Sequence, residues 1–287
     1  MTRRENILAG LKKVPPLPVA SVRVLQRLQD PNVDLRELTG LIEYDTSLTT
    51  NILRLVNSAY FGAPRAIGSI HEAIVRLGTR TLSEVVISSA VGPITQVPIR
   101  GYDLPAGELW THSAAVAIGA RELSAALKTP EPKSLFTMAL LHDIGKIVLG
   151  NFVEVDVAPI LDLVNRERIP FEAAEQQVLG IDHAEVGAAL LELWNLPPGI
   201  ADVARWHHRP DELEGDRQAV DMVHVADILC LMSGIGTGID GLNYRPSDGT
   251  VSRLGLSVHV CEAVIAKILN GVEALREMFV SAAGRVR

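Results

Sequence analysis

The stretch SLFTMALLHDIGKIVL, residues 134–149, decides the fold of this chain because it is apolar almost all round its helical surface. A helix of that composition belongs in the middle of a helical bundle. Its apolar surface is interrupted by His142, Asp143 and Lys146. Buried histidine and carboxylate groups are costly unless they are paired or bound to a metal. Two interpretations follow: a metal site, or a buried Asp143–Lys146 ion pair with His142 bonded to a carbonyl.

Polar residues of the same kinds recur in the apolar helical segments on either side of this stretch. Glu108 and His112 are four residues apart and so share a helical face, although such a pair is ordinarily solvated. Asp227 lies within the apolar segment VHVADILCLM, residues 223–232, where an unpaired carboxylate would be costly. We therefore expect Asp227 to have a partner, and His112 is a candidate ligand.

Three further histidines lie at the ends of predicted helices. Asp182 is expected to cap a helix whose first turn contains His183, with Glu185 as its capping-box partner. His207 and His208 end a helix that begins near residue 198, where they complement the helix dipole. Each histidine alone has this ordinary structural explanation, and only their number suggests a shared site. Imidazole and carboxylate ligands together suit Fe, Mn, Zn or Ni.

The hydrophobic pattern predicts an all-α fold with two helical subdomains. Apolar residues recur at three- and four-residue spacing between residues 19 and 95, with Asp34 and Asp45 as expected helix caps. The stretch TQVPIRGYDLPA, residues 95–106, is the expected connector, so the subdomains are residues 1–100 and 101–287. Residues 234–255 are glycine-rich and without periodicity, so we expect a long loop there, either functional or disordered. Its glycines do not form a phosphate loop, because no Lys-Ser/Thr follows them and no strand precedes them.

Composition excludes several classes of function. The net charge of −7 argues against nucleic-acid binding, which needs a basic surface. No apolar run is long enough to span a membrane, and the N-terminal MTRRENILAG is charged, unlike a signal peptide. Cys230 and Cys261 lie in apolar surroundings and are expected to be small buried hydrophobic residues in a reducing cytoplasm.

Taken together, the order His…His-Asp…His…His-His…Asp resembles the HD superfamily of metal-dependent phosphohydrolases, including its HD-GYP branch. The resemblance implies an HD-type helical bundle for residues 101–287. It implies two sets of metal ligands that share one aspartate: His112, His142, Asp143 and Asp227 for one ion, and Asp143, His183, His207 and His208 for the other. It also implies that Glu108 can bind a third ion. Lys146 would face the substrate phosphate, so Asp143 and Lys146 are the expected catalytic residues.

The N-terminal half identifies the branch, because it resembles the HDOD domain. This resemblance extends as one unit over residues 14 to about 270. The matching segments are VPPLPV at 14–19, LTGLIEYDTSL at 38–48, ILRLVNSAYFG at 52–62, SIHEAIVRLG at 69–78, HDIGK at 142–146 and WNLPPGIADVARWHH at 194–208. Thr46 stands where the family usually has proline. RPDELEGD follows His208 in place of the Gly-Tyr-Pro segment of HD-GYP proteins. The resemblance therefore does not carry over hydrolysis of cyclic di-GMP.

Three hypotheses follow. In the first, the chain is a bacterial signalling output module of the kind attached to receiver or sensor domains, with those signalling proteins as partners. In the second, it is a phosphohydrolase acting on a nucleotide or cyclic dinucleotide. Its cofactors would be two divalent ions, Fe, Mn or Zn, with Ni and Mg as further candidates. In the third, the histidines are buried and hydrogen-bonded without metal, which requires separate partners for each.

Overall fold

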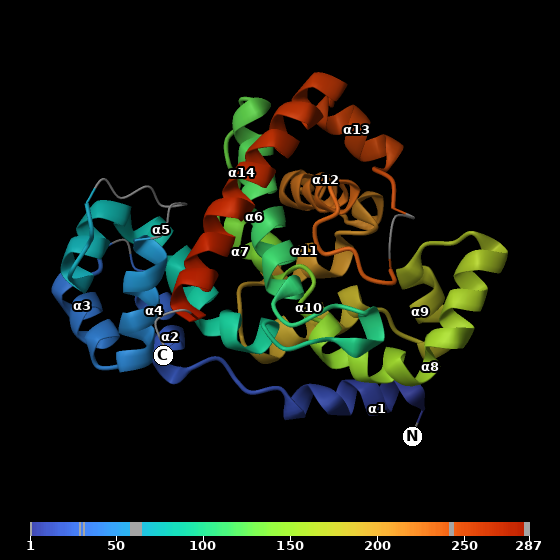
Figure 1. Cartoon of the computed structure of the whole chain (residues 1–287), viewed down its shortest axis with the longest axis horizontal. Coiled ribbons are helices and arrows are strands. Elements are labelled where there is room, and N and C mark those ends of the chain that lie inside the picture. Colours follow the sequence, from blue (N-terminus) through green and yellow to red (C-terminus); the bar gives the residue numbers. More distant parts are fainter. Residues whose placement is uncertain (1, 29, 31, 58–64, 241–243, 284–287) are drawn as a thin grey trace. The chain divides into compact units, whose positions relative to one another are not determined.

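The computed structural model describes residues 2–28, 30, 32–57, 65–240 and 244–283, the last ten of these for their backbone alone. Within these residues every regular element is a helix, and the one β-bridge joins Ile99 to Leu104 (Figure 1). The all-α prediction is confirmed. Residues 58–62 of the NSAYFG segment, which carried part of the resemblance, lie outside the described residues.

The chain divides into two compact units. Unit 1 comprises residues 1–15 and 94–269, and unit 2 comprises residues 16–93 and 270–287. The division falls between Pro93 and Ile94, next to the stretch 95–106 that was expected to connect the subdomains. The first 15 residues, expected in the N-terminal subdomain, group with unit 1.

Unit 2 contains short amphipathic helices and most of α5 (Ile70–Thr95), whose helical backbone is interrupted at Gly78 (φ +72°). The short helices are α2 (Val19–Arg27), α3 (Leu35–Glu43) and α4 (Thr46–Val56). The predicted caps are confirmed, because Asp34 accepts from the backbone N–H of Arg36 and Asp45 from that of Leu48. Thr46 therefore begins α4 without the proline that the family usually has there.

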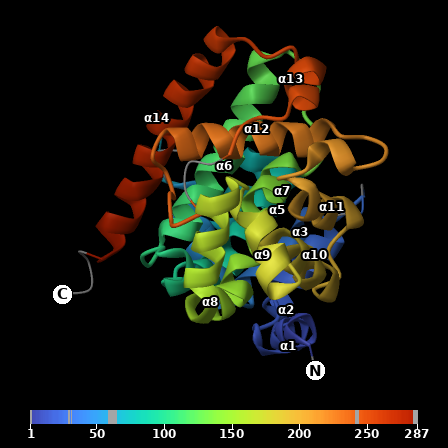
Figure 2. The ribbon, with the colours of Figure 1, turned by 90° about the vertical axis from the view of Figure 1, so that its right-hand side faces the viewer.

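Unit 1 contains the remaining helices. They are α1 (Arg3–Gly10), η1 (Leu11–Lys13), η3 (Arg100–Tyr102), α6 (Glu108–Ala126), α7 (Leu135–Leu141), α8 (Lys146–Glu167), α9 (Phe171–Leu179), α10 (His183–Leu193), α11 (Pro198–Trp206), η4 (Pro210–Glu212), α12 (Gln218–Met232), α13 (Asp248–Leu254) and the first part of α14 (Val258–Ala283). Helix α6 packs on α7 and α12, and α10 packs on α11 (Figure 2). Both α6 and α12 are buried along most of their length, which makes them the centre of the bundle.

The stretch 134–149 forms two helices, so the expectation of one continuous helix was wrong. Helix α7 ends at Leu141 and α8 begins at Lys146. In the turn between them the backbone hydrogen bonds tighten to i,i+3, as from Lys146 N–H to the Asp143 carbonyl at 3.0 Å. Gly145 lies so close to α10 that a Cβ there would be 2.0 Å from the carbonyl oxygen of His183. This tertiary contact, invisible in the helical pattern, places the turn against the first residue of α10.

The glycine-rich stretch 234–255 was expected to be a loop throughout, and this too was partly wrong. Its last third contains α13, capped by the Ser247 hydroxyl, which accepts from the backbone N–H of Thr250. Arg253 of this helix forms ion pairs with Asp211 and Asp221, which holds it against η4 and α12. The short helix escaped detection because its seven residues are too few to show a hydrophobic period.

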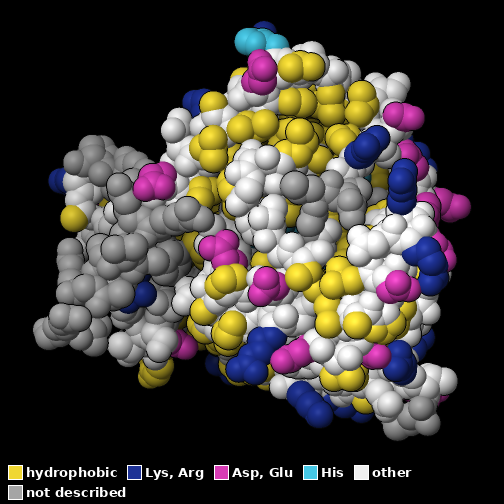
Figure 3. Space-filling view, turned by 45° about the vertical axis from the view of Figure 1, so that its right-hand side comes forward, with side chains coloured by type: hydrophobic (Ala, Val, Ile, Leu, Met, Phe, Trp, Pro, Cys, Tyr) yellow, Lys and Arg dark blue, Asp and Glu magenta, His cyan; other side chains and the backbone are white. Residues whose placement is uncertain are grey.

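The surface and the cysteines agree in part with the expectations from composition. On the face drawn in Figure 3, lysine and arginine side chains are interspersed with aspartate and glutamate. Both cysteines are free, and Cys230 is buried whereas Cys261 is half-buried. Among the described residues no single helix has the length and apolar character to cross a membrane; only α13 and the first part of α14, bent by 91° between them, pass together on length and composition.

Candidate metal centre

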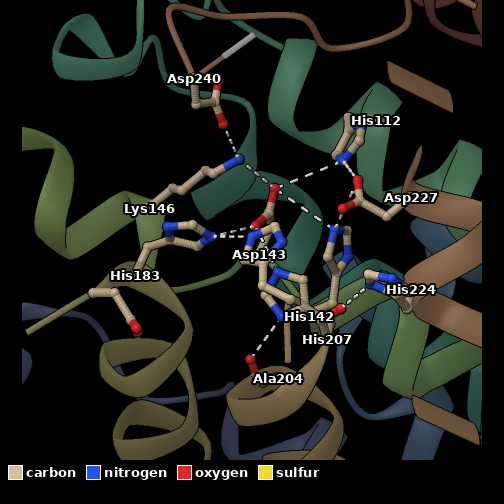
Figure 4. Close-up of polar contacts among 12 residues, drawn as sticks. His112, His142, Asp143, Lys146, His183, Ala204, His207, His224, Asp227 and Asp240 are labelled. Carbon is tan, nitrogen blue, oxygen red and sulfur yellow. Dashed lines mark hydrogen bonds and ion pairs between the residues drawn. The ribbon is translucent and has the colours of Figure 1, made fainter. Parts of the chain in front are cut away.

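Seven of the predicted ligands come together inside unit 1. Figure 4 labels all of them except His208. They come from α6, the α7–α8 turn, the start of α10, the end of α11 and the middle of α12: His112, then His142 and Asp143, then His183, then His207 and His208, then Asp227. All except His208 are buried, with at most 2% of each residue exposed. The bundle thus gathers segments separated by more than a hundred residues.

These residues form two groups, and within each group the ligand atoms all lie within 4.8 Å of one another. One group is His112, His142 and Asp227; the other is Asp143, His183, His207 and His208. Asp143 lies between them. Its Oδ2 is 3.6 Å from Nε2 of both His112 and His142, whereas its Oδ1 is 3.4 Å from Nε2 of His183 and 3.7 Å from Nε2 of His207. The two oxygens of one carboxylate therefore face two different sets of imidazoles.

Backbone carbonyls orient three of the imidazoles. The Nδ1–H groups of His142 and His207 donate to the carbonyls of Ala139 and Ala204 at 2.7 Å, and that of His112 donates to the Ile235 carbonyl at 3.0 Å. A carbonyl can only accept, so each Nδ1 carries a proton and each ring turns its Nε2 into the site. Burial lowers the pKa of His142 and His207, so Nε2 of these two rings presents a lone pair, whereas Asp227 outweighs burial at His112 and raises its pKa. Carbonyl and carboxylate partners of this kind fix metal-ligating histidines in known sites.

The atoms that point into the site lack partners. Nε2 of His112, His142 and His207 and Oδ1 of Asp143 are buried without a hydrogen bond in the part of the chain that the structure describes. The His112 Nε2 is 3.0 Å from Asp227 Oδ1, a distance that becomes a hydrogen bond only when the ring is doubly protonated. Buried unpaired polar atoms are rare and costly, and divalent ions would satisfy all four. The donor set fits a metal centre.

His183 is oriented by a carboxylate that sequence reasoning missed. Glu175, on α9, accepts from both the backbone N–H and the Nδ1–H of His183, at 2.9 and 2.8 Å. Its other oxygen accepts from the hydroxyl of Tyr102. Burial alone would lower the pKa of His183, but the negative charge of Glu175 outweighs it and raises this pKa to about 9. Without metal this imidazole is therefore protonated at neutral pH.

His208 completes the second group from its rim. Its Nε2 is 2.9 Å from Nε2 of His183, and the ring of Tyr244 stacks on it at 4.7 Å and 10°. Burial and the neighbouring imidazoles hold the pKa of His208 well below its usual range. This ring is neutral at pH 7, as a metal ligand must be.

Lys146 lies beside both groups and contacts two carboxylates. Its ammonium donates to Oδ2 of Asp143 and Oδ2 of Asp240, each at 2.7 Å. Burial raises the pKa of Asp143, but Lys146 and the surrounding histidines outweigh it and hold this pKa well below its usual range. The Asp143–Lys146 ion pair and the hydrogen bond from His142 to the Ala139 carbonyl are the contacts expected of a buried site without metal. They are present together with the unpaired ligand atoms, so they do not exclude a metal.

The other residues considered for the site or its helix caps lie outside the two groups. Glu108 is half-buried in the first turn of α6 and belongs to neither group, so its role as a third ligand stays a prediction. Asp182 caps α10 as predicted, but Glu185 pairs with Arg4 rather than closing a capping box. His224 of α12 donates from Nδ1 to the His207 carbonyl at 2.6 Å and so supports the turn that presents His207 and His208.

The fold and this site define a class: an all-helical protein with buried histidine–aspartate groups able to hold metal. The comparison with family models is consistent with it, because the HDOD domain model matches residues 14–210. The chain belongs to the HDOD domain family.

Proteins of known structure support this membership. An HDOD domain protein of unknown function from Geobacter sulfurreducens is 27% identical, with a TM-score of 0.69 over 98% of this chain and 96% of that one. A structure from Shewanella amazonensis, named "Putative phosphohydrolase", is 26% identical, with a TM-score of 0.63 over 91% and 97%. An uncharacterized protein of Treponema pallidum (strain Nichols) is 29% identical over 206 residues, which are 71% of this chain and 39% of that relative. The chain thus spans well under half the length of the curated relative.

Proposed function

We propose that this protein is a metal-dependent phosphohydrolase that serves bacterial signalling. The observation that carries the proposal is the set of buried ligand atoms without a hydrogen-bond partner on His112, His142, Asp143 and His207, which belong to the two groups able to hold a metal ion. A purely structural cluster gains nothing from leaving those atoms unpaired. The name of the Shewanella relative is consistent with this class of activity.

Each residue has a part in this proposal. Each of the two groups would hold one divalent ion, and Asp143, whose two oxygens face the two sets of imidazoles, would serve both. Such ions supply a Lewis acid for the phosphoester and make water acidic enough to act as a nucleophile near neutral pH. The ammonium of Lys146 positions the phosphate and stabilises its developing negative charge. Glu175 keeps His183 in its orientation, with Nε2 toward the site.

A second candidate is a signalling module in which the metal centre only senses or stabilises. It is favoured by the extent of the family match, residues 14–210, which includes most of unit 2. None of the residues described in unit 2 belongs to either metal-binding group. In this case sensor or receiver domains are the partners, and hydrolysis is dispensable.

Substitution of His142 and Asp143 by alanine separates the two candidates. Hydrolysis of bis-(p-nitrophenyl) phosphate by the metal-loaded protein should fall to the background rate, because both groups lose a ligand. Replacing the exposed His259 by alanine is the matched control and should leave the rate unchanged. A double variant that folds, as judged by circular dichroism, and hydrolyses at the wild-type rate would contradict the proposal. Signalling that persists without hydrolysis would favour the second candidate.

A further inference from the structure

The segment between α12 and α13 is attached to the metal centre at several points. We call its described residues, 234–240 and 244–247, the strap. The Ile235 carbonyl accepts from Nδ1–H of His112, and the Ile239 N–H donates to the Tyr102 carbonyl at 2.9 Å. Further along, the Ser247 N–H donates to Nε2 of His224, the residue that supports His207. The strap therefore contacts His112 of one group and, through the stacked ring of Tyr244, His208 of the other.

Two glycines allow this close approach. A Cβ on Gly236 would lie 2.4 Å from Cβ and 2.7 Å from Cγ of His112, and Gly236 also has a φ of +71°. A Cβ on Gly238 would lie 2.1 Å from the Tyr102 carbonyl oxygen. These glycines have no role in a phosphate loop. They let the backbone lie directly against one ligand and against the tyrosine beside Lys146.

In the middle of the strap, the carboxylate of Asp240 accepts a hydrogen bond from the ammonium of Lys146 (Figure 4). Asp240 is only 1% exposed, and its Oδ1 is buried without a hydrogen-bond partner among the described residues. The other contacts of the ammonium are Oδ2 of Asp143 and the ring of Tyr102, whose centroid is 5.4 Å from Nζ. A phosphate that reached Lys146 would therefore meet Asp240, a group of the same charge already bonded there.

The remaining neighbours of Lys146 cannot give way as Asp240 can. Asp143 is three residues away in a turn packed on α10, and its oxygens face the imidazoles. Asp240 instead belongs to a segment without regular structure, and one of its carboxylate oxygens is unpaired. Of the two carboxylates on Lys146, Asp240 is the one that an incoming anion can replace.

We propose that Asp240 is an internal competitor for the phosphate-binding position on Lys146, and that the strap is released when a phosphate group takes that position. This inference rests on the proposed function, in which Lys146 receives the phosphate. Release of the strap alters its contacts with His112 and His224, and also the segment that leads to α13. Phosphate binding at the metal centre thereby changes the segment that leads to the start of α13. This change provides a route by which binding is transmitted from the site.

Phosphate binding to the manganese-loaded protein tests the competition. Isothermal titration with inorganic phosphate should give a Kd about tenfold lower for Asp240→Asn than for the wild type, because the competing charge is removed. Asp248→Asn removes the same charge from the exposed first residue of α13 and should leave the Kd unchanged. A parallel titration with dimethyl phosphate distinguishes a phosphoester from free phosphate as the natural ligand. Tighter binding of either anion by Asp240→Asn than by the wild type supports the competition.

Hydrogen exchange in the wild type tests the release without any variant. The amide of Ile239 is bonded to the Tyr102 carbonyl, so phosphate should accelerate its exchange by at least about tenfold if the strap opens. Equal phosphate affinity in the wild type and Asp240→Asn, with unchanged exchange at Ile239, would overturn the competition and leave the proposed function standing. Absence of phosphate binding in both metal-loaded proteins would overturn the role of Lys146, and the competition with it.

Discussion

Asp143 shows how one residue can organise the whole centre. Its two oxygens face separate sets of imidazoles, and its Oδ2 also accepts from Lys146. The sequence marked this residue because a carboxylate in a strongly apolar helical stretch needs a partner. Glu175 and Asp240, which contact His183 and Lys146, were not recognised. Glu175 lies in an ordinary amphipathic segment and Asp240 in a stretch without periodicity, so only the tertiary structure shows which groups they meet.

The protonation of His183 predicts how metal affinity depends on pH. Because the pKa of its imidazole is raised to about 9 in the metal-free protein, a metal ion must displace a proton below that pH. Affinity for Mn²⁺ or Zn²⁺ should therefore increase with pH between about pH 7 and pH 9, approaching tenfold per pH unit, and level off above. Titration calorimetry in buffers of different ionisation enthalpy measures both the affinity and the proton released.

Glu175→Gln serves as the comparison for this pH dependence. It removes the charge that raises the pKa of His183, so the rise in affinity should level off at a lower pH. It also weakens an oriented ligand, which costs roughly 10–100-fold in metal affinity in known sites. An affinity that does not change with pH over this interval in the wild type would show that His183 is not a ligand.

At the scale of elements, the turn between α7 and α8 sets the position of the first two ligands. Helical periodicity identified the stretch as central to the bundle but predicted one helix, because every residue in it is compatible with a helix. The break depends on Gly145, which packs on the carbonyl of His183 and on Gly187 of α10. Close packing of two backbones is a property of the assembled bundle. The same reason explains the strap, whose glycines are recognisable but whose contacts with His112 and Tyr102 are not.

Gly145→Ala should therefore be strongly destabilising. Its Cβ would lie 2.0 Å from the His183 carbonyl oxygen and 2.5 Å from the Gly187 nitrogen, both backbone atoms that cannot rotate away. We expect a loss of unfolding free energy of about 1–3 kcal/mol or more, together with weaker metal binding as the turn moves from α10. Chemical denaturation with urea, and metal titration of the same variant, measure the two effects.

Gly40→Ala provides the control for that substitution. Gly40 lies within α3, and a Cβ there would have no atom within 4 Å. Since alanine favours a helix over glycine, this variant should be as stable as the wild type or more stable, by up to about 1 kcal/mol. If Gly145→Ala behaved like Gly40→Ala, the close contact between the turn and α10 would be contradicted.

At the scale of the whole molecule, the two units differ in chemistry. All seven grouped ligands lie in unit 1, whereas the described helices of unit 2 carry apolar stripes and polar caps. The family match nevertheless includes most of unit 2, so what defines the family is more than a metal centre. The sequence predicted the helical class and seven positions that the bundle brings together. Residues 1–15 were not assigned to unit 1, because their packing on α8 and α10 leaves no local pattern.

The most direct test of the central claim is the metal content of the protein, purified without chelator or nickel affinity and measured by elemental analysis. We expect about two equivalents of Fe, Mn or Zn per chain, falling to near zero in the His142→Ala, Asp143→Ala double variant. A wild-type protein that is empty and does not load with any of these ions on reconstitution would contradict it. The histidines would then have a structural role alone, within an all-helical HDOD domain.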